Sequence, residues 1–195
     1  MFPAEAVERV VARARGTAPA CGDTRIVCID GPAGSGKSTL SEQVSDRLGG
    51  APVVHMDDLY RGWDQELGAP LANRIVAWLL DAWAAGLPGR HLRYDWHAGR
   101  YTEWVEVVPA PVAILEGCGS ASRELRARAS CVVWVEAPED ARLQRGLARD
   151  GAALEPRWRA WMQREAEHFA ADGTRAAADI VLDGAAGAAG AAARR

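Results

Sequence analysis

A glycine-rich segment, Gly31–Ser38, constrains the fold of this chain more than any other feature. Its sequence, Gly-Pro-Ala-Gly-Ser-Gly-Lys-Ser, matches the pattern G-x-x-x-x-G-K-[ST] at every fixed position. A strand-like apolar run, Arg25–Asp30, precedes it, and a helical pattern, Lys37–Leu48, follows it. The glycines let the backbone turn several N–H groups toward one anion, and the helix N-terminus adds positive partial charge. The segment therefore predicts a phosphate-binding loop between a strand and a helix.

The residues of this loop have separate expected roles toward a nucleoside triphosphate. We expect the Lys37 ammonium to reach the β- and γ-phosphates and the Ser38 hydroxyl to bind Mg²⁺. Thr39 is expected beside the α-phosphate. A loop that only connects strand to helix is the poorer interpretation, because the match is complete and its context is right. The predicted cofactor-binding residues are Gly31, Ala33, Gly34, Ser35, Gly36, Lys37, Ser38 and Thr39.

Short apolar runs alternate with helical patterns along the rest of the chain. Further strands are expected at 52–56, 112–116, 131–135 and 179–182, and further helices before Gly16 and at 71–85, 138–149 and 155–171. The segment 92–108, which turns at Gly99, is typical of a β-hairpin. The pattern predicts an α/β fold of the P-loop NTPase type, with three layers (α/β/α), a mostly parallel sheet, a small hairpin insertion and a helical lid.

One domain is expected over residues 1–184. The hairpin, at about 90–108, would lie on the acceptor side, and the lid would span about 138–160. The Ala/Gly-rich tail, 185–195, is expected to be flexible. Ligands of such sheets bind beyond the carboxyl ends of the strands. Gly31, Asp57 and Glu116 all fall at such ends, so we expect them to meet in one crevice.

Composition excludes several classes of function. The 195 residues include 23 basic and 26 acidic side chains, so no net positive field favours nucleic acid. The N-terminus lacks the apolar core of a signal peptide, and no apolar run is long enough to span a membrane. The four cysteines lack metal-binding spacing, and we expect reduced, buried thiols in a cytoplasmic protein. Monomer and homo-oligomer both remain open.

The type of phosphate-binding protein follows from the other motifs of the chain. There is no N-K-x-D or T-K-x-D segment of the kind that reads guanine, which disfavours a GTPase. There is also no apolar run that ends in Asp-Glu, which disfavours the motor ATPases. Small-molecule kinases remain as the favoured class, with ATP as the expected donor and GTP not distinguished from it.

Four segments resemble the uridine–cytidine kinases and their phosphoribulokinase relatives. They are His55–Tyr60, Arg93–Arg100, Ile114–Gly117 and Ala141–Asp150, which are similar to the family's D-S-F-Y, Y-D-F…H-S-R, F-E-G-I and R-L-x-R-R-x-x-R-D segments. They occur in the family order within roughly residues 26–150. Together with Asp57–Asp64, the pattern is still more similar to the uridine-kinase-like proteins of high-GC bacteria.

The resemblance implies roles for the residues at matching positions. Asp57 matches the family's catalytic aspartate, which takes the proton from the sugar 5′-hydroxyl. Glu116 matches an acid near Mg²⁺, and Tyr60 and Tyr94 match aromatic residues that shape the nucleoside pocket. The arginines of the family's lid, which close on the phosphates, correspond to Arg142, Arg145 and Arg149.

The acceptor side departs from the family pattern. The segment after Tyr94 is shorter, so His97 is not equated with the family's base-reading histidine. Asp58 replaces a serine and Trp96 replaces a phenylalanine, which leaves the identity of the acceptor open. The substrate-binding residues expected on this side are Asp58, Tyr60, Trp63, Arg93, Tyr94, Trp96, His97 and Arg100.

The chemistry of phosphoryl transfer supports the same assignments. The reaction needs positioning and charge neutralisation, and a carboxylate can orient the acceptor hydroxyl and take its proton. Either Asp57 or Asp58 could be that base, since adjacent side chains at a strand end diverge; a turn or helix cap is the alternative role for the pair. The expected catalytic residues are Asp57, Lys37, Arg142, Arg145 and Arg149, and the expected metal ligands are Ser38, Glu116 and Asp57.

Structural alternatives stand beside these roles. Glu116 could be a solvated loop acid, and the three arginines, spaced three and four apart, could form an ordinary charged helix face. Most of the eight tryptophans are expected in the core, with Trp63 and Trp96 as candidates to stack on a planar acceptor. The favoured interpretation of Trp158, Trp161, Glu165 and His168 is packing beneath the lid.

The predicted function is ATP-dependent transfer of the γ-phosphate to a hydroxyl of a nucleoside-like small molecule. One alternative is a nucleoside monophosphate kinase of the cytidylate type, or another metabolite kinase. The segment Ile29–Lys37 is similar to cytidylate kinases, and four arginines could grip an acceptor phosphate: Arg61, Arg74, Arg93 and Arg100. A second alternative is a nucleotide-binding accessory module, which would need neither Asp57 nor an arginine lid.

Overall fold

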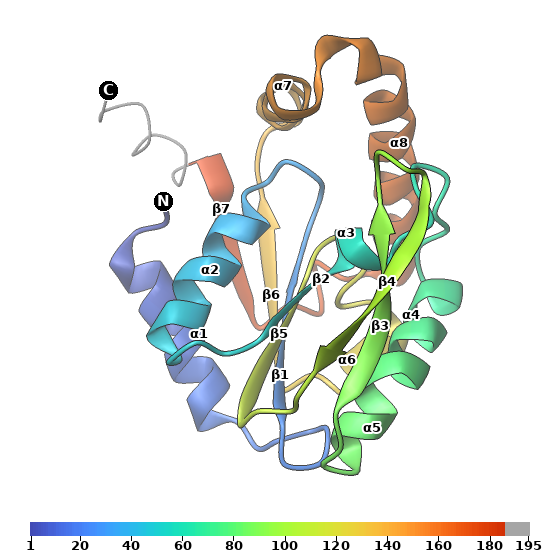
Figure 1. Cartoon of the computed structure of the whole chain (residues 1–195). Coiled ribbons are helices and arrows are strands. Elements are labelled where there is room, and N and C mark those ends of the chain that lie inside the picture. The colour runs from blue at the N-terminus through green and yellow to red at the C-terminus, as the bar shows by residue number, and fades with distance from the viewer. Residues whose placement is uncertain (186–195) are drawn as a thin grey trace.

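Five strands form a parallel sheet at the centre of the molecule (Figure 1). They are Arg25–Asp30 (β1), Val53–His55 (β2), Val112–Glu116 (β5), Cys131–Glu136 (β6) and Ile180–Asp183 (β7). Their order across the sheet is β2-β5-β1-β6-β7, and every neighbouring pair runs parallel. The computed structural model describes residues 1–185, so the predicted flexible tail lies, except for Ala185, outside the described residues.

Helices cover both faces of this sheet, which confirms the predicted three-layer fold (Figure 1). One face carries Ala4–Gly16 (α1) and Lys37–Arg47 (α2). The other carries Ala69–Ile75 (α4), the π-helical turn Val76–Leu80 (η1), Asp81–Ala84 (α5), Arg123–Arg126 (α6) and Glu155–Asp172 (α8). Met56–Leu59 (α3) follows β2, and Glu139–Asp150 (α7) joins α8 through the 3₁₀ turn Ala152–Leu154 (η2).

The central strand β1 shows why both faces must be covered. Successive side chains of a strand point to opposite faces. Ile26 and Cys28 pack in the core beneath α4, η1 and α5, whereas Val27 and Ile29 pack in the core beneath α1 and α2. All four side chains are buried. A strand that is apolar on both faces is stable only when helices exclude water from each.

A separate hairpin forms the predicted insertion. Its strands, Gly89–Asp95 (β3) and Arg100–Val107 (β4), pair antiparallel with each other and form a two-stranded sheet of their own. Side-chain hydrogen bonds attach it to the body; in two of them, Trp83 Nε1 donates to the Val107 carbonyl oxygen over 3.0 Å, and the Tyr101 hydroxyl donates to the Leu59 carbonyl oxygen over 2.7 Å. The second bond joins β4 to α3.

The structure differs from the sequence-based prediction around the two aspartates. We expected Asp57 and Asp58 at the end of a strand, but β2 ends at His55 and both residues lie in α3. The Tyr60 amide donates to the Met56 carbonyl oxygen over 3.1 Å, which closes this single helical turn. Side chains of adjacent helical residues also point in different directions, so the expected divergence does not require the strand.

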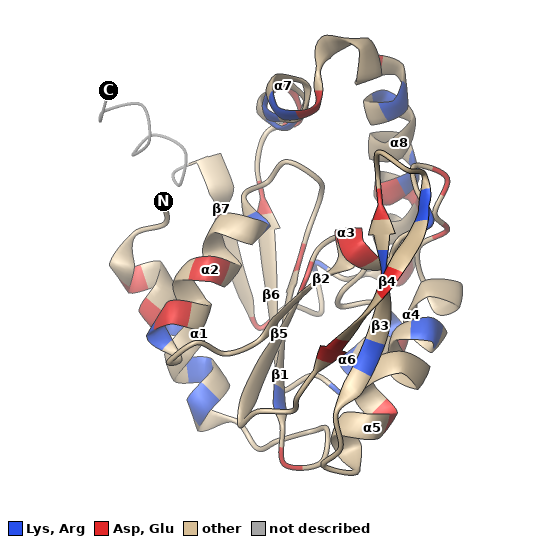
Figure 2. Cartoon of the chain, viewed as in Figure 1, with Lys and Arg blue, Asp and Glu red and all other residues tan. Residues whose placement is uncertain are grey.

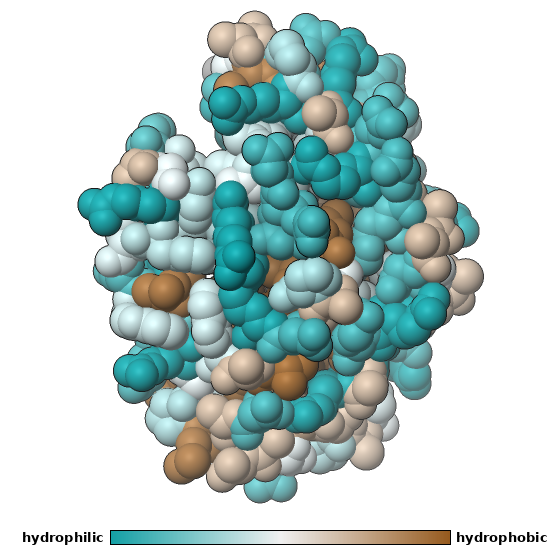
Figure 3. Space-filling model, turned by 90° about the vertical axis from the view of Figure 1, so that its right-hand side faces the viewer, coloured by the Kyte–Doolittle hydropathy of each residue, from teal (hydrophilic) through white to brown (hydrophobic). Residues whose placement is uncertain are grey.

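The surface of the hairpin side is largely polar. In Figure 3, which faces the right-hand side of Figure 1, the apolar residues form small separate groups among hydrophilic ones. No helix within residues 1–185 combines the length and the apolar character needed to cross a bilayer.

Candidate functional site

A cavity of about 740 Å³ opens between the glycine-rich loop (Gly31–Ser38), α3 and the α7–α8 segment. It lies where the strands end, as the topology of parallel sheets predicts. Eleven of its lining residues are Ala33, Gly34, Gly36, Lys37, Ser38, Thr39, Glu116, Gly117, Arg145, Gly146 and Arg149. The others are Asp57, Asp58, Tyr60, Trp63, Trp96, His97, Cys118, Asp150, Leu154, Trp158 and Trp161. The cavity thus brings together most of the predicted site residues.

The glycine-rich loop has the tight backbone that a phosphate cradle needs. Gly34 has φ of +77°, and a Cβ there would lie 2.6 Å from the Arg142 carbonyl oxygen, so only glycine fits. Lys37 begins α2, and its ammonium donates to the Pro32 carbonyl oxygen over 3.0 Å. Burial lowers the pKa of Lys37, but Cys118 and the carboxylates of Glu116 and Glu165 outweigh it, so its pKa is raised. The side chain therefore keeps its positive charge beside the loop.

Asp30, immediately before the loop, fixes the backbone on which the loop rests. Its carboxylate accepts three backbone N–H groups: Gly31 at 2.6 Å, Gly119 at 2.9 Å and Ala121 at 2.8 Å. These bonds join the end of β1 to the segment after β5. Burial raises the pKa of Asp30 to about 6, although the three N–H donors act in the opposite direction. Asp30 carried no predicted role, although its position, a carboxylate at the end of an apolar strand directly before a glycine, was a signal that could have found it.

Ser38 and Glu116 lie together, although 78 positions separate them. The Ser38 hydroxyl donates to Glu116 Oε1 over 3.2 Å, and His55 Nδ1 lies 2.7 Å from Glu116 Oε2. The hydrogen bond with Glu116 raises the pKa of His55. Glu116 is buried, so the alternative of a solvated loop acid is wrong.

The Ser38–Glu116 pair fits a divalent cation. A hydroxyl and a carboxylate oxygen side by side are ligands that suit Mg²⁺, which takes few protein ligands and shares its sphere with phosphates and water. Within residues 1–185, no group of three or more His, Cys, Asp and Glu side chains could enclose a metal by themselves.

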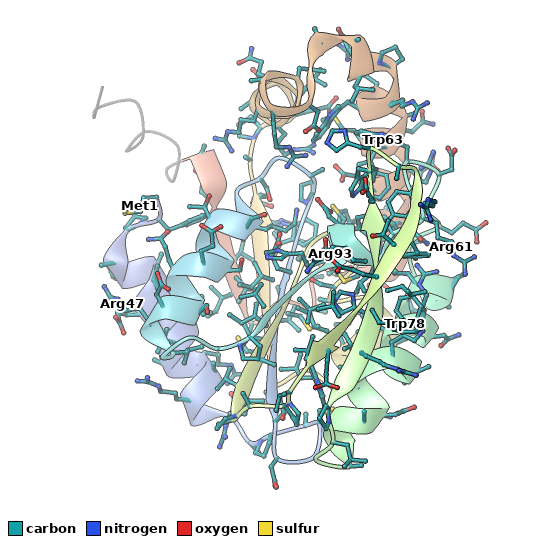
Figure 4. The ribbon with its side chains drawn as sticks, in the orientation of Figure 1. Met1, Arg47, Arg61, Trp63, Trp78 and Arg93 are labelled. Atoms are coloured by element: carbon teal, nitrogen blue, oxygen red, sulfur yellow. The ribbon has the colours of Figure 1, made fainter. Side chains whose placement is uncertain are left out.

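Aromatic side chains, those of Trp63, Trp96, Trp158 and Trp161, form one wall of the cavity. The Trp63 ring meets Trp96 edge-on with centroids 5.6 Å apart and Trp158 with centroids 5.9 Å apart. Figure 4 shows Trp63 beneath the α7–α8 segment. The Trp158 indole N–H donates to Asp150 Oδ2 over 3.0 Å, which holds this ring on the cavity. Trp158 and Trp161 were expected only to pack, yet both line the cavity as well.

Asp57 lines the same cavity as this wall and the loop. Burial raises its pKa, and the neighbouring Glu116 carboxylate adds to the rise, while Lys37 and Arg149 act against it. Tyr60 is buried and donates its hydroxyl to the Cys118 carbonyl oxygen over 2.7 Å. Tyr60 therefore contributes the face of its ring to the wall rather than a free hydroxyl.

Three predicted acceptor residues do not line the cavity. Arg93 is held between carboxylates, with Glu103 at 2.7 Å and Asp58 at 3.6 Å. Tyr94 packs edge-on against Trp96, with centroids 5.4 Å apart, so it supports the wall from behind. Arg100 pairs with Asp95 in the hairpin register. The hairpin residues that do line the cavity, Trp96 and His97, come from the turn between the two strands, whereas Arg93, Tyr94 and Arg100 lie in the strands themselves.

The three arginines of α7 do not form one free cationic stripe. Arg145 donates to the Gly34 carbonyl oxygen over 3.0 Å and lines the cavity. Arg149 also lines the cavity and pairs with Asp150 at 2.7 Å. Arg142 is instead buried and bonded to Glu165 at 2.8 Å, so its charge is neutralised away from the cavity. Figure 2 shows these basic residues on α7 and the acidic pair on α3.

Two further residues at the site carried no functional prediction. Cys118 lies in the cavity wall, with its Sγ 3.8 Å from Lys37 Nζ. Glu165 touches the glycine-rich loop through the Ala33 amide, at 2.9 Å. The sequence pointed to Glu165 only through its spacing, which places it on one face of a helix with Trp158 and Trp161. All four cysteines are buried and free, as expected.

Known proteins resemble this chain in structure but not in sequence. No family model matches the chain, and a search of curated proteins found no match. A possible uridine kinase from Bacillus stearothermophilus superposes with a TM-score of 0.65 at 20% identity, over 92% of this chain and 98% of the other. A candidate fructose transport system kinase from Silicibacter sp. TM1040 gives 0.59 at 22% identity, over 93% and 99%. At these identities the likeness shows the fold alone, and it extends over nearly the full length of both chains.

Proposed function

We propose that this protein is an ATP- and Mg²⁺-dependent kinase that phosphorylates a hydroxyl of a nucleoside-like small molecule, acting as one cytoplasmic domain with a lid at about 138–160. One observation carries the proposal: the glycine-rich loop and Asp57 face the same cavity, with an aromatic wall beyond them. A phosphate donor and a planar acceptor would therefore meet at a carboxylate. The two structural neighbours that are described as kinases support the same class of reaction.

The donor half is built to neutralise phosphate charge. Lys37 supplies one cation from α2, and Arg145 and Arg149 supply two more from α7. Ser38 and Glu116 would hold Mg²⁺, which would supply further charge neutralisation on the phosphates. Such preorganised cations lower the barrier most where charge shifts from the γ-phosphate to the leaving ADP.

The acceptor half would supply orientation and a proton acceptor. Asp57 would accept the hydrogen bond of the acceptor hydroxyl and take its proton. The hydroxyl oxygen would then form a bond to the γ-phosphorus as the bond to the β–γ bridging oxygen breaks and ADP leaves. The raised pKa of Asp57 suits this role, because a more basic carboxylate takes a proton more readily. Trp63 and Trp96 would hold a planar group by their rings.

The arginines that a nucleoside monophosphate kinase would need are committed elsewhere. Arg74 donates to the Leu59 carbonyl oxygen over 2.7 Å and to Gln65 over 2.8 Å. Arg93 is paired with two carboxylates, and neither Arg61 nor Arg100 lines the cavity. An acceptor phosphate would thus meet Asp57 and Asp58 without a free arginine from this set, which favours an unphosphorylated acceptor.

ADP release in the presence of candidate acceptors tests the proposal. Nucleosides, nucleoside monophosphates and sugars would each be added to the protein with ATP and Mg²⁺, and Lys37→Ala would serve as the control for contaminating activity. A nucleoside or related hydroxyl compound should stimulate ADP formation, and a nucleoside monophosphate should not. No stimulation by any member of the panel would support a nucleotide-binding accessory module instead.

A further inference from the structure

Glu165 of α8 lies where four parts of the molecule meet. Its Oε2 accepts the Ala33 amide of the glycine-rich loop at 2.9 Å and the Trp161 indole N–H at 3.0 Å. Its Oε1 accepts Arg142 of α7 at 2.8 Å. The Cys118 thiol, after β5, lies 3.4 Å from Oε2. The side chain is 1% exposed, so water does not share these contacts.

The Glu165–Arg142 ion pair holds one residue of the loop, Ala33, by both its N–H and its carbonyl oxygen. Glu165 accepts the Ala33 N–H, and Arg142 donates to the Ala33 carbonyl oxygen over 3.2 Å. Arg142 also donates to the Ala137 carbonyl oxygen over 3.1 Å, which anchors it to the end of β6. A buried ion pair is costly to desolvate unless its remaining hydrogen-bonding groups are also satisfied, and here both partners make further bonds. The Ala33 N–H donates to the Glu165 carboxylate and so is not free to bind a phosphate in this structure. This differs from the phosphate-binding role that we predicted for Ala33.

The same carboxylate reaches the aromatic wall. Trp161 lines the cavity and packs on Tyr60 with ring centroids 5.2 Å apart, and on Trp63 with centroids 6.4 Å apart. Its indole N–H has Glu165 as its acceptor. Glu165 therefore contacts both the loop and the wall through one carboxylate oxygen, Oε2.

We propose that Glu165 is a positioning residue that sets the glycine-rich loop and the Trp161 wall relative to each other. The effect of Glu165 on phosphate transfer rests on the proposed function. Its effect on the glycine-rich loop concerns nucleotide binding alone. Misplacement of about 1 Å between reacting groups can cost about a hundredfold in rate, so a rigid link between donor and acceptor halves has a direct kinetic consequence.

Glu165→Gln tests this role, because it keeps the size of the side chain and removes its charge. Binding of a non-hydrolysable ATP analogue, measured by calorimetry, should weaken about tenfold, since the amide cannot accept from Ala33, Trp161 and Arg142 at once. Glu167→Gln, an exposed residue of the same helix, is the matched control and should bind as the unaltered protein does. Equal affinity in both variants would overturn the proposal.

A second variant separates the two contacts. Trp161→Phe removes the N–H that Glu165 accepts, together with part of the indole ring, and leaves the bond to Ala33 in place. It should leave nucleotide affinity unchanged and raise the KM for the acceptor about threefold to tenfold, with kcat less affected. A loss of nucleotide affinity in Trp161→Phe would overturn the assignment of separate contacts.

A third variant decides the matter if Glu165→Gln does not fold. Arg142→Lys keeps the positive charge but cannot span Glu165, Ala33 and Ala137 together. It should weaken analogue binding about tenfold, and unchanged affinity would overturn the proposal. Because analogue binding needs no acceptor, failure of the proposed kinase activity and failure of the positioning role would be seen in different measurements.

Discussion

The indole N–H of Trp96 donates a hydrogen bond to the backbone carbonyl oxygen of Asp57 over 3.1 Å. Trp96 follows β3 of the hairpin, and Asp57 lies in α3, so this bond crosses from the insertion to the body of the protein. It places an aromatic ring beside the residue that we propose as the base. The geometry of the acceptor side therefore depends on the hairpin as well as on the central sheet.

We expect Trp96→Phe to weaken the acceptor side selectively. A smaller aromatic ring remains, but the hydrogen bond to the Asp57 carbonyl oxygen, worth about 1 kcal/mol, is lost. The KM for the acceptor should rise about fivefold, and the KM for ATP should stay unchanged, as measured by steady-state kinetics. Trp104→Phe is the control, since Trp104 of the same hairpin is half-exposed, packs on Trp78 and does not line the cavity. An equal effect on both substrates would contradict this role.

Substitution of the two aspartates should distinguish the base from its neighbour. Asp57→Asn should lower kcat by a factor of about 10² to 10⁴, the range of a general base, while binding of an ATP analogue remains. Asp58→Asn should cost less than about tenfold, because Asp58 is already engaged by Arg93 at 3.6 Å. The reverse ranking would identify Asp58 as the base.

Asp30 should make the stability of the protein depend on pH. Its pKa in the folded protein is about 6, above the usual 3.8, so the folded state binds a proton more tightly than the unfolded state does. This contribution is fully present below about pH 4 and is lost as pH rises through about 6, a change of order 3 kcal/mol. Urea unfolding at pH 4 and pH 7 would measure it.

Asp30→Asn provides the comparison, because an amide does not titrate in this range. The variant should be less stable at both pH values, since its one oxygen cannot accept all three backbone N–H groups. Its stability should change less between pH 4 and pH 7 than that of the unaltered protein. A constant difference between the two proteins across the range would contradict the raised pKa.

Gly146→Ala should destabilise the contact between α7 and α8. A Cβ on Gly146 would lie 2.3 Å from Cζ2 of the Trp158 ring, so the ring must move from the cavity wall. We expect a loss of about 1–3 kcal/mol from this overpacking, although alanine alone favours a helix by about 1 kcal/mol. Gln144→Ala, at an exposed position of the same helix, should be neutral or slightly stabilising. Chemical denaturation of both variants measures the difference, and a more stable Gly146→Ala protein would show that the ring is not fixed there.

Local patterns in the sequence predicted the framework of the molecule well. The complete glycine-rich motif predicted the strand–loop–helix unit. Apolar runs located the remaining strands, because a strand that is buried on both faces is apolar along its whole length. The hairpin was predicted from its alternation and its Gly99 turn. These features depend on residues that are close together in the sequence, and a local sequence pattern contains that information.

The parts that escaped prediction depend on partners far apart in the chain. The spacing of the arginines in α7 is compatible with a free stripe, and nothing local reveals that Arg142 meets Glu165, 23 residues later. The π-helical turn Val76–Leu80 also interrupts a helix whose apolar pattern looks continuous. In both cases tertiary packing selects one outcome among several that the local sequence allows.

The independence of the β3–β4 sheet has an evolutionary consequence. The hairpin shares no backbone ladder with the five-stranded sheet, yet the segment between its strands brings Trp96 and His97 to the cavity. Insertions, deletions and substitutions there leave the register of the central strands untouched. Selection can thus change the proposed acceptor side while the proposed nucleotide site stays the same. Proteins that share the central sheet can therefore differ in substrate through changes in this one hairpin.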